Sequence, residues 1–184
     1  MRKLLGILLL TLSCPLPAQF EDVSIKTVPV GGAVYMMEGR GGNLGVMTGP
    51  DGVLLIDDQY APLTAKILAA IAEIDDGPIR FVLNTHWHFD HTGGNEELGG
   101  MGAVIVSQDN ARQRMSTDQF MQVIDRNILA LPPAALPVVT FNDRVTFHFN
   151  GEAVVAYHAA HAHTDGDSII HFPQCNYIHM GDIF

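Results

Sequence analysis

The sequence predicts a single layered α/β domain, with β-sheet on the inside and helices on the outside. Short strand-like runs come first, then a helix, a buried strand, a further helical region and strands again, which is the order expected of such layers. Glycine-rich turns separate the first runs. The chain has 184 residues, of which 47% are hydrophobic, and this is enough to bury a core without disulfide bonds.

The first 18 residues have the layout of a secretory signal peptide. Arg2 and Lys3 provide a positively charged start, positions 4–12 form an apolar core, and the segment PLPA ends on the small residue Ala18. The apolar run is too short to cross a bilayer comfortably, so we expect cleavage after Ala18. Residues 19–184 would then form the mature domain, in the periplasm or outside the cell.

Charge and cysteine content limit the classes of partner. The net charge is −10, and loss of Arg2 and Lys3 with the signal peptide would make it −12. An acidic surface repels phosphate backbones and anionic headgroups, so we expect a small-molecule substrate, no nucleic acid and no integral membrane segment after signal removal. Cys175 would be the only remaining cysteine, which excludes a disulfide framework and indicates a core residue. Nothing in the sequence specifies an oligomeric state.

The first part of the mature chain reads as four short strands followed by a helix. Segment 61–75 has apolar residues at helical spacing and Pro62 in its first turn, which predicts an amphipathic helix. The four predicted strands cover residues 23–30, 33–38, 43–49 and 52–57.

The remaining elements alternate before the chain returns to strands. Residues 108–131 are expected to contain one or two helices, and the segment LPPAALP at 131–137 an irregular connection over the surface. We expect buried strands at 79–84 and 103–107, and further strands at 144–149, 153–158, 168–172 and 176–180.

The segment THWHFDHTGGN, residues 85–95, crowds imidazole and carboxylate groups into the loop that follows the strand at 79–84. His86 and His88, two residues apart, can face one ion, while Asp90 and His91 can face a second ion beyond a tight turn. This ligand set suits zinc, with iron or manganese possible. A single histidine is usually an ordinary hydrogen-bonded group, but four such groups without a cation would cost several kcal/mol in desolvation and repulsion.

Further ligands should come from later in the chain. His163 lies in the turn HTDGD between two predicted strands, where a loop ligand belongs, and Asp182 follows the last predicted strand and could place a carboxylate between two ions. His158 and His161 are expected to be exposed or to support the ligands rather than bind the ions. We interpret the remaining strand histidines as packing residues: His148, His171 and His179.

The motifs THWHFDHTGGN, AHTDGD and GDIF, in this order and at these separations, resemble those of the metallo-β-lactamase superfamily. The resemblance covers essentially all of the mature chain, and it implies a four-layer αββα sandwich with the metals at one edge of the two sheets. Two zinc ions are implied, the first held by three histidines and the second by Asp90 and His91, with Asp182 between them. Asp57, after an early strand, would brace the site. The first ion would be held by His86, His88 and His163.

Two features depart from the family pattern. Dinuclear members complete the second site with a histidine well downstream of the bridging aspartate, and this sequence ends before that point, so we expect the C-terminal part of the second half to be missing. The true β-lactamases of the superfamily do not combine residues like His91 and Asp182 in this way. They have cysteine or serine at the later position. The combination of His91 and Asp182 is closer to glyoxalase II and the broad hydrolase branch.

The predicted activity is that of an exported, zinc-dependent hydrolase. A water bridging two ions would lose a proton near neutral pH, and the resulting hydroxide would attack a carbonyl carbon in a lactam, thioester or lactone. Asp90 would orient that nucleophile and could pass its proton to the leaving group. Two alternatives remain: an iron-dependent oxidoreductase with the same fold, and a catalytically incomplete fragment. A nuclease is the weakest interpretation because the surface is acidic.

Overall fold

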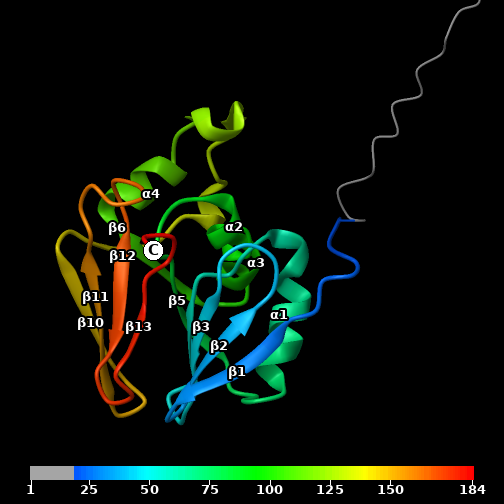
Figure 1. Cartoon of the computed structure of the whole chain (residues 1–184), viewed down its shortest axis with the longest axis vertical. Coiled ribbons are helices and arrows are strands. Elements are labelled where there is room, and N and C mark those ends of the chain that lie inside the picture. Colours follow the sequence, from blue (N-terminus) through cyan, green and yellow to red (C-terminus); the bar gives the residue numbers. More distant parts are fainter. Residues whose placement is uncertain (1–18) are drawn as a thin grey trace, which may run out of the picture.

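The computed structural model describes residues 19–184, so the predicted signal peptide lies outside the described residues. Two β-sheets pack face to face, and helices cover the outer face of the larger sheet (Figure 1). The predicted α/β fold is therefore confirmed. No helix in the described part of the chain is long and apolar enough to cross a membrane.

The larger sheet has seven strands in the order β1-β2-β3-β4-β5-β6-β9. The first four strands are antiparallel, whereas β4, β5, β6 and β9 run parallel, so that their carboxyl ends meet at one edge. The short strand β9, which pairs with β6, was not predicted. The strands are β1 (Lys26–Gly31), β2 (Val34–Glu38), β3 (Leu44–Met47), β4 (Val53–Ile56), β5 (Ile79–Leu83), β6 (Val104–Gln108) and β9 (Val139–Phe141).

The smaller sheet is a four-stranded antiparallel meander in the order β10-β11-β12-β13. Each of its strands coincides with a predicted one. The hairpins between them are short, except for the connection from β11 to β12, which includes His163. The strands are β10 (Arg144–Phe149), β11 (Glu152–His158), β12 (Ser168–Phe172) and β13 (Tyr177–His179).

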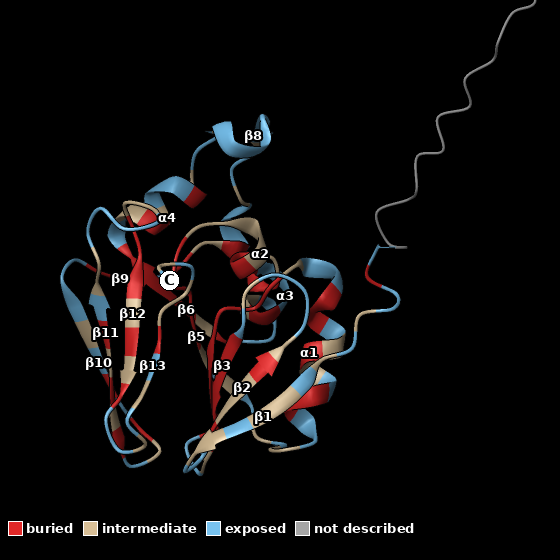
Figure 2. Cartoon of the chain, in the orientation of Figure 1, coloured by how far each residue is buried: buried red, intermediate tan, exposed pale blue. Residues whose placement is uncertain are grey.

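Two hydrophobic cores lie on opposite faces of the larger sheet. Alternate side chains of β4 point to opposite faces, and all four are buried because both faces are covered. Leu54 and Ile56 pack against Phe172 and other residues of the smaller sheet. Val53 and Leu55 belong to the second core, which includes Ile67 of α1 (Thr64–Ala72). Figure 2 shows this buried interior between the layers.

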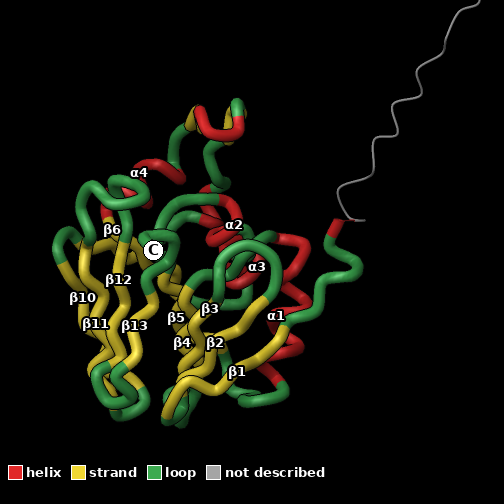
Figure 3. The backbone as a smooth tube through the Cα atoms, in the orientation of Figure 1, coloured by secondary structure: helices red, strands yellow, loops and turns green. Residues whose placement is uncertain are grey.

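The helices lie beside the larger sheet (Figure 3). Pro62 is in a short 3₁₀ turn, η2 (Ala61–Leu63), that leads into α1, as its position in the first helical turn predicts. Within residues 19–184 no helix covers the outer face of the smaller sheet, so three of the four expected layers lie in this part of the chain. The other helices are α2 (Phe89–Thr92), α3 (Asn95–Gly100) and α4 (Asp109–Met115).

The region between residues 108 and 131 contains one helix rather than two. After α4 the chain forms an antiparallel hairpin, β7 (Gln119–Met121) and β8 (Arg126–Ile128), around the 3₁₀ turn η3 (Gln122–Ile124). Val123 at its tip is 96% exposed, so a second helix here would have had no apolar face to bury. The expectation of one or two helices is met by α4 alone, and the hairpin that follows it was not predicted.

The connection at 131–137 is partly built into the interior. Its 3₁₀ turn, η4 (Pro133–Ala135), buries Ala135, and the carbonyl of Ala135 accepts a hydrogen bond of 3.0 Å from the side chain of Asn95. The prediction that this segment runs only over the surface is therefore wrong at Ala135.

The strand histidines divide in a way that the sequence pattern did not predict. His148 is exposed and His171 half-buried, and both lie on the outer face of the smaller sheet, so their assignment as packing residues is wrong. His179 is buried, and its Nε2 lies 3.0 Å from the carbonyl oxygen of Asn43 in the other sheet. Of the three, only His179 contributes to the contact between the sheets.

Candidate metal centre

The candidate ligands gather at the edge where the parallel strands end. Asp57 directly follows β4, and His86 and His88 lie on the loop after β5, which runs parallel to β4. The smaller sheet contributes His163 from the β11–β12 connection and Asp182 from the segment after β13. Residues from both sheets therefore meet at one edge, as the motifs predicted.

Three histidines form the first group of potential ligand atoms. His86 Nε2 lies 3.0 Å from His88 Nδ1, and the same Nδ1 atom lies 3.0 Å from His163 Nε2. The group runs from buried His86 through half-buried His88 to exposed His163. Two nitrogens bound to one tetrahedral zinc ion at about 2.0–2.1 Å would lie roughly 3.3 Å apart, close to these separations.

The protonation of His86 suits metal binding. The hydroxyl of Thr85 donates a 2.7 Å hydrogen bond to Asp57, so it can accept the 3.0 Å hydrogen bond from Nδ1–H of His86. The Nε2 lone pair is then directed at the other histidines. Burial, followed by the charge of His91, lowers the pKa of His86 to about 3, and burial together with His163 lowers the pKa of His88 to about 4. Both rings are therefore neutral at pH 7, as ligands must be.

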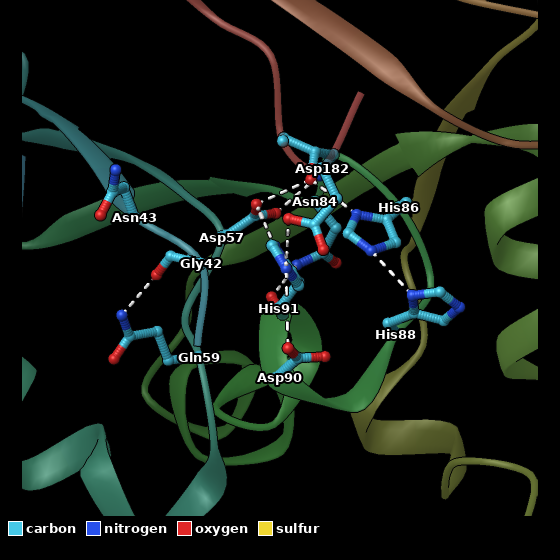
Figure 4. Close-up of polar contacts among 12 residues, drawn as sticks. Gly42, Asn43, Asp57, Gln59, Asn84, His86, His88, Asp90, His91 and Asp182 are labelled. Carbon is cyan, nitrogen blue, oxygen red and sulfur yellow. Dashed lines mark hydrogen bonds and ion pairs between the residues drawn. The ribbon is translucent and has the colours of Figure 1, made fainter. Parts of the chain in front are cut away.

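A second group shares His86 and adds His91 and Asp182. His91 Nε2 lies 3.2 Å from Asp182 Oδ1 and 3.9 Å from Asp90 Oδ2 (Figure 4). The other oxygen of Asp182 lies 3.8 Å from His163 Nε2, so this carboxylate sits between the two groups. Asp90 and His91 are on the short helix α2 rather than on a loop. Asp90, although predicted as a ligand, belongs to neither of the two groups of closely spaced ligand atoms.

His91 is fixed from behind by Asp57. Its Nδ1 lies 2.8 Å from Asp57 Oδ2, and Asp57 Oδ1 accepts a 2.7 Å hydrogen bond from the backbone of Thr85. These contacts place Asp57 where the predicted bracing role requires it. Burial alone would raise the pKa of Asp57, but His91 lowers it. Burial alone would lower the pKa of His91, yet Asp57 and Asp182 raise it to about 10.

One buried nitrogen of this second group has no hydrogen-bond partner among the described residues. His91 Nε2 is buried and makes no hydrogen bond within the described residues, although Asp182 is near. Buried polar atoms are rarely left without a partner. A cation next to Nε2, Asp182 and Asp90 would satisfy this nitrogen and neutralise the carboxylates. The donor set of both groups therefore fits divalent metal ions.

Backbone packs directly on the edge of the His91 ring. A Cβ atom at Gly42 would collide with Cε1 of His91, so only glycine fits in the turn between β2 and β3. The side chain of Gln59 holds this turn by donating a hydrogen bond to the carbonyl of Gly42 (Figure 4). The turn closes the buried side of the second group.

Several residues that support the site were not predicted from the sequence. Asn84 donates a hydrogen bond of 3.3 Å to the carbonyl of His91 and exchanges two hydrogen bonds with Asn95. Asp58 accepts a 2.8 Å hydrogen bond from the backbone of Gly94, and burial raises its pKa well above the usual range. The only signal for either residue was a polar side chain at the end of a buried strand. Gln59 gave no such signal.

The two histidines that were set aside do not join the ligand groups. His158 Nε2 lies 3.0 Å from the carbonyl oxygen of Asp165, and His161 is exposed, with a left-handed backbone conformation at φ 59°. Their predicted exclusion as ligands agrees with this placement. Cys175 is half-buried beside the core between the sheets.

Comparison with known proteins gives the family. The sequence profile of the Metallo-beta-lactamase superfamily matches residues 37–184. The chain belongs to the metallo-beta-lactamase superfamily. The resemblance drawn from the motifs is therefore confirmed, and the domain match includes every candidate ligand.

Solved metallo-beta-lactamases share the fold. The subclass B3 enzyme MEM-A1 from a soil metagenome library superposes with a TM-score of 0.68 at 22% identity, covering 81% of this chain and 58% of that one. The subclass B3 enzyme BJP-1 of Bradyrhizobium japonicum gives 0.69 at 20% identity, covering 85% and 60%. At these identities the likeness establishes the fold alone.

Two curated proteins are similar in sequence. The α subunit of 2,4-dinitroanisole O-demethylase from a Nocardioides species is 23% identical over 178 residues, which are 95% of this chain and 51% of that protein. The lactamase-like protein aptB of Emericella nidulans is 35% identical over 89 residues, 47% of this chain and 29% of that protein. The chain thus spans about half the length of the first relative and less of the second.

Proposed function

We propose that this protein is a zinc-dependent hydrolase that opens a carbonyl-centred bond in a small molecule. The single observation that carries the proposal is the meeting of two groups of potential ligand atoms that share His86. A lone cluster of three histidines would fit a single ion with one open coordination position. Two adjacent clusters joined by a carboxylate are typical of sites that activate water between two ions.

Each candidate residue has a role in this proposal. His86, His88 and His163 would hold the first ion, Asp90 and His91 the second, and Asp182 would contact both. Ions in such a centre would make water nucleophilic at neutral pH and polarise a carbonyl group. Asp90 would act as the catalytic residue because it is partly exposed, with 25% of its side chain accessible, and its free oxygen can orient the nucleophile and move its proton.

A cavity beside the centre supports a substrate with an apolar or aromatic part. It measures about 430 Å³ and is lined by three aromatic rings, those of Phe20, Tyr60 and Phe89, with centroids 5.1 and 5.8 Å apart in succession. Arg126 of the β7–β8 hairpin is its only charged lining residue. Phe89 and Asp90 are neighbours on α2, so this short helix forms a wall of both the cavity and the candidate centre.

Export to the periplasm or to the medium is part of the proposal, and the signal-like N-terminus supports it. The acidic net charge supports a small-molecule substrate rather than nucleic acid.

The deciding experiment combines metal analysis with a panel of substrates. Purified protein should contain zinc and hydrolyse at least one of a chromogenic β-lactam, a thioester and a lactone. His88→Ala and Asp90→Asn should lower the rate by orders of magnitude with an unchanged circular dichroism spectrum. His148→Ala is the matched control, because this histidine is exposed on the outer face of the smaller sheet.

The alternatives give different results in the same experiment. Iron in place of zinc, with consumption of oxygen, would support the oxidoreductase. Bound zinc without turnover of any substrate would support the incomplete fragment. Normal hydrolysis by His88→Ala would show that the assigned roles are wrong.

A second substrate class is the aryl ethers. The relative named as a 2,4-dinitroanisole O-demethylase subunit aligns with 95% of this chain, and the aromatic cavity is suited to a substituted ring. The panel should therefore include 2,4-dinitroanisole, with release of the nitrophenol as the readout. Turnover of the ether but of no lactam, thioester or lactone would favour this class.

A further inference from the structure

The position of His163 depends on the loop that contains it. His86 is oriented by Thr85 and His91 by Asp57, but the polar neighbours of the His163 ring, among the described residues, are only His88 at 3.0 Å and Asp182 at 3.8 Å. Both neighbours are themselves candidate ligands. The side chain of His163 is 34% exposed, and its ring packs edge-to-face only on the rings of His86 and His88 among the described residues, with centroids 5.0 and 4.8 Å away.

The helix α4 forms hydrogen bonds and packing contacts with this loop, beginning two residues beyond His163. The carbonyl of Asp165 accepts a 2.8 Å hydrogen bond from the side chain of Asn110. Arg114 donates to both oxygens of the Asp165 carboxylate, from Nη2 to Oδ2 at 2.7 Å and from Nε to Oδ1 at 3.3 Å, a two-pronged geometry that fixes direction as well as distance. Gly166 lies against the helix so closely that a Cβ atom there would be 2.5 Å from the backbone nitrogen of Ala111.

The helix is a firm support for this contact. Ala111 and Met115 are buried, and Arg112 donates a 2.8 Å hydrogen bond to the carbonyl of Pro137. Gln119 in the following hairpin accepts a 3.1 Å hydrogen bond from Nη1 of Arg114 and so holds the guanidinium from its other end. Arg114 therefore transmits the position of α4 to the loop.

A surface ion pair is the simpler interpretation, since 45% of the Arg114 side chain and 42% of the Asp165 side chain are exposed. Such pairs add little to stability. Three observations favour a more specific role: the two-pronged geometry, the additional hydrogen bond to the Asp165 carbonyl, and the position two residues from a ring whose other contacts are with candidate ligands. The pair also lines a hollow of about 250 Å³ together with Trp87, His88 and His163.

We propose that Arg114 and Asp165 are positioning residues that hold His163 in place for the first ion. This inference rests on the proposed metal centre. Supporting residues around a metal site typically contribute 10–100-fold in metal affinity. Because the pair acts through a loop rather than through the ring itself, we expect a loss near the lower end, about 10-fold.

The test measures metal affinity rather than activity. Cobalt(II) is titrated into the full chain against a chromophoric chelator, and the visible spectrum of bound cobalt reports the geometry of the site. Arg114→Met and Asp165→Asn should each weaken binding of the first ion about 10-fold and alter the spectrum, and the double variant should be no weaker than either single one. Lys26→Met is the matched control, because Lys26 forms an exposed ion pair with Glu38 at 3.1 Å, far from the site in the larger sheet.

A second comparison shows whether the pair acts through His163. In a His163→Ala background, Arg114→Met should cause no further loss of affinity, whereas a merely structural contribution would persist. If Arg114→Met binds cobalt as tightly as the wild type, or if the loss is the same without His163, the inference is wrong while the proposed function stands. If the wild type binds no ion, the proposed function fails and this inference fails with it.

Discussion

The two sides of the candidate centre are built in different ways. On the buried side, His91 is held by Asp57, covered by the backbone of Gly42 and inaccessible to solvent. On the open side, His163 lies on an exposed loop that is held from outside by Arg114. One side is thus fixed by buried hydrogen bonds, so that substitutions there should destabilise the protein. The other side depends on surface contacts that can be removed without unfolding the protein.

The histidines of the candidate centre also differ in charge. Burial lowers the pKa values of His86 and His88, so these rings are neutral and ready to bind a cation. The pKa of His91 is raised instead, because Asp57 and Asp182 outweigh its burial. The metal-free protein thus holds a proton where the second ion would bind. We infer that the first ion binds without competition, and that the second must displace this proton.

The largest effect should come from Asp57→Ala on the buried side. Removal of a buried carboxylate leaves Nδ1 of charged His91 and the amide of Thr85 without a partner, and the free energy of unfolding should fall by about 3–5 kcal/mol. Urea denaturation of the metal-free protein measures this loss. Asp165→Ala on the open side should cost at most about 1 kcal/mol, because that carboxylate is exposed. Equal losses for the two variants would contradict the comparison.

The next effect is on the pH dependence of stability. The pKa of His91 rises from about 6.5 in the unfolded chain to about 10 in the folded protein. This stabilisation is complete below pH 6.5 and is lost as the pH rises towards 10, by an amount on the order of a few kcal/mol. Urea denaturation of the metal-free protein at pH 6.5 and pH 9.5 should detect it.

Substitutions on the two sides of the centre should affect the pH dependence of stability differently. His91→Ala should remove most of the fall in stability between these two pH values, whereas His163→Ala should leave it in place. A fall that survives His91→Ala would have to come from another group.

A smaller effect is expected from Gly42→Ala. The new methyl group would collide with the His91 ring, and overpacking of this kind costs about 1–3 kcal/mol. The displaced ring should lose the second ion while the three histidines on the other side keep the first. Native mass spectrometry should therefore find one ion per chain instead of two. Gly100→Ala is the control, since a Cβ atom at Gly100 would meet nothing within 4 Å.

Much of the fold could be predicted because periodicity and turns were clear. All four strands of the smaller sheet and helix α1 follow from alternating or helical patterns of apolar residues. The strand β9 was not predicted, because its three residues closely follow the irregular segment 131–137 and two of them are exposed. The hairpin after α4 was missed because its exposed apolar residues, such as Val123, resemble a helix face when no partner is considered.

The candidate ligands could be predicted from spacing, but their supports could not. His86, His88, Asp90 and His91 stand in one short motif, so the sequence itself places them together. The contacts from Gly42 and Arg114 join segments that are distant along the chain, and only the folded structure brings them to the site. The protonation state of His91 could not be predicted either, since its raised pKa depends in part on Asp182 from the other sheet.

The candidate centre draws its residues from both sheets, with His86, His88 and His91 from the larger one and His163 and Asp182 from the smaller. An ion bound there would act as a cross-link between the two halves of the sandwich. It would shorten the effective loop between them, as a disulfide bond would. Docking of the sheets and loading of metal would then be one cooperative event, so a chelator would loosen the whole domain rather than merely switch off its chemistry.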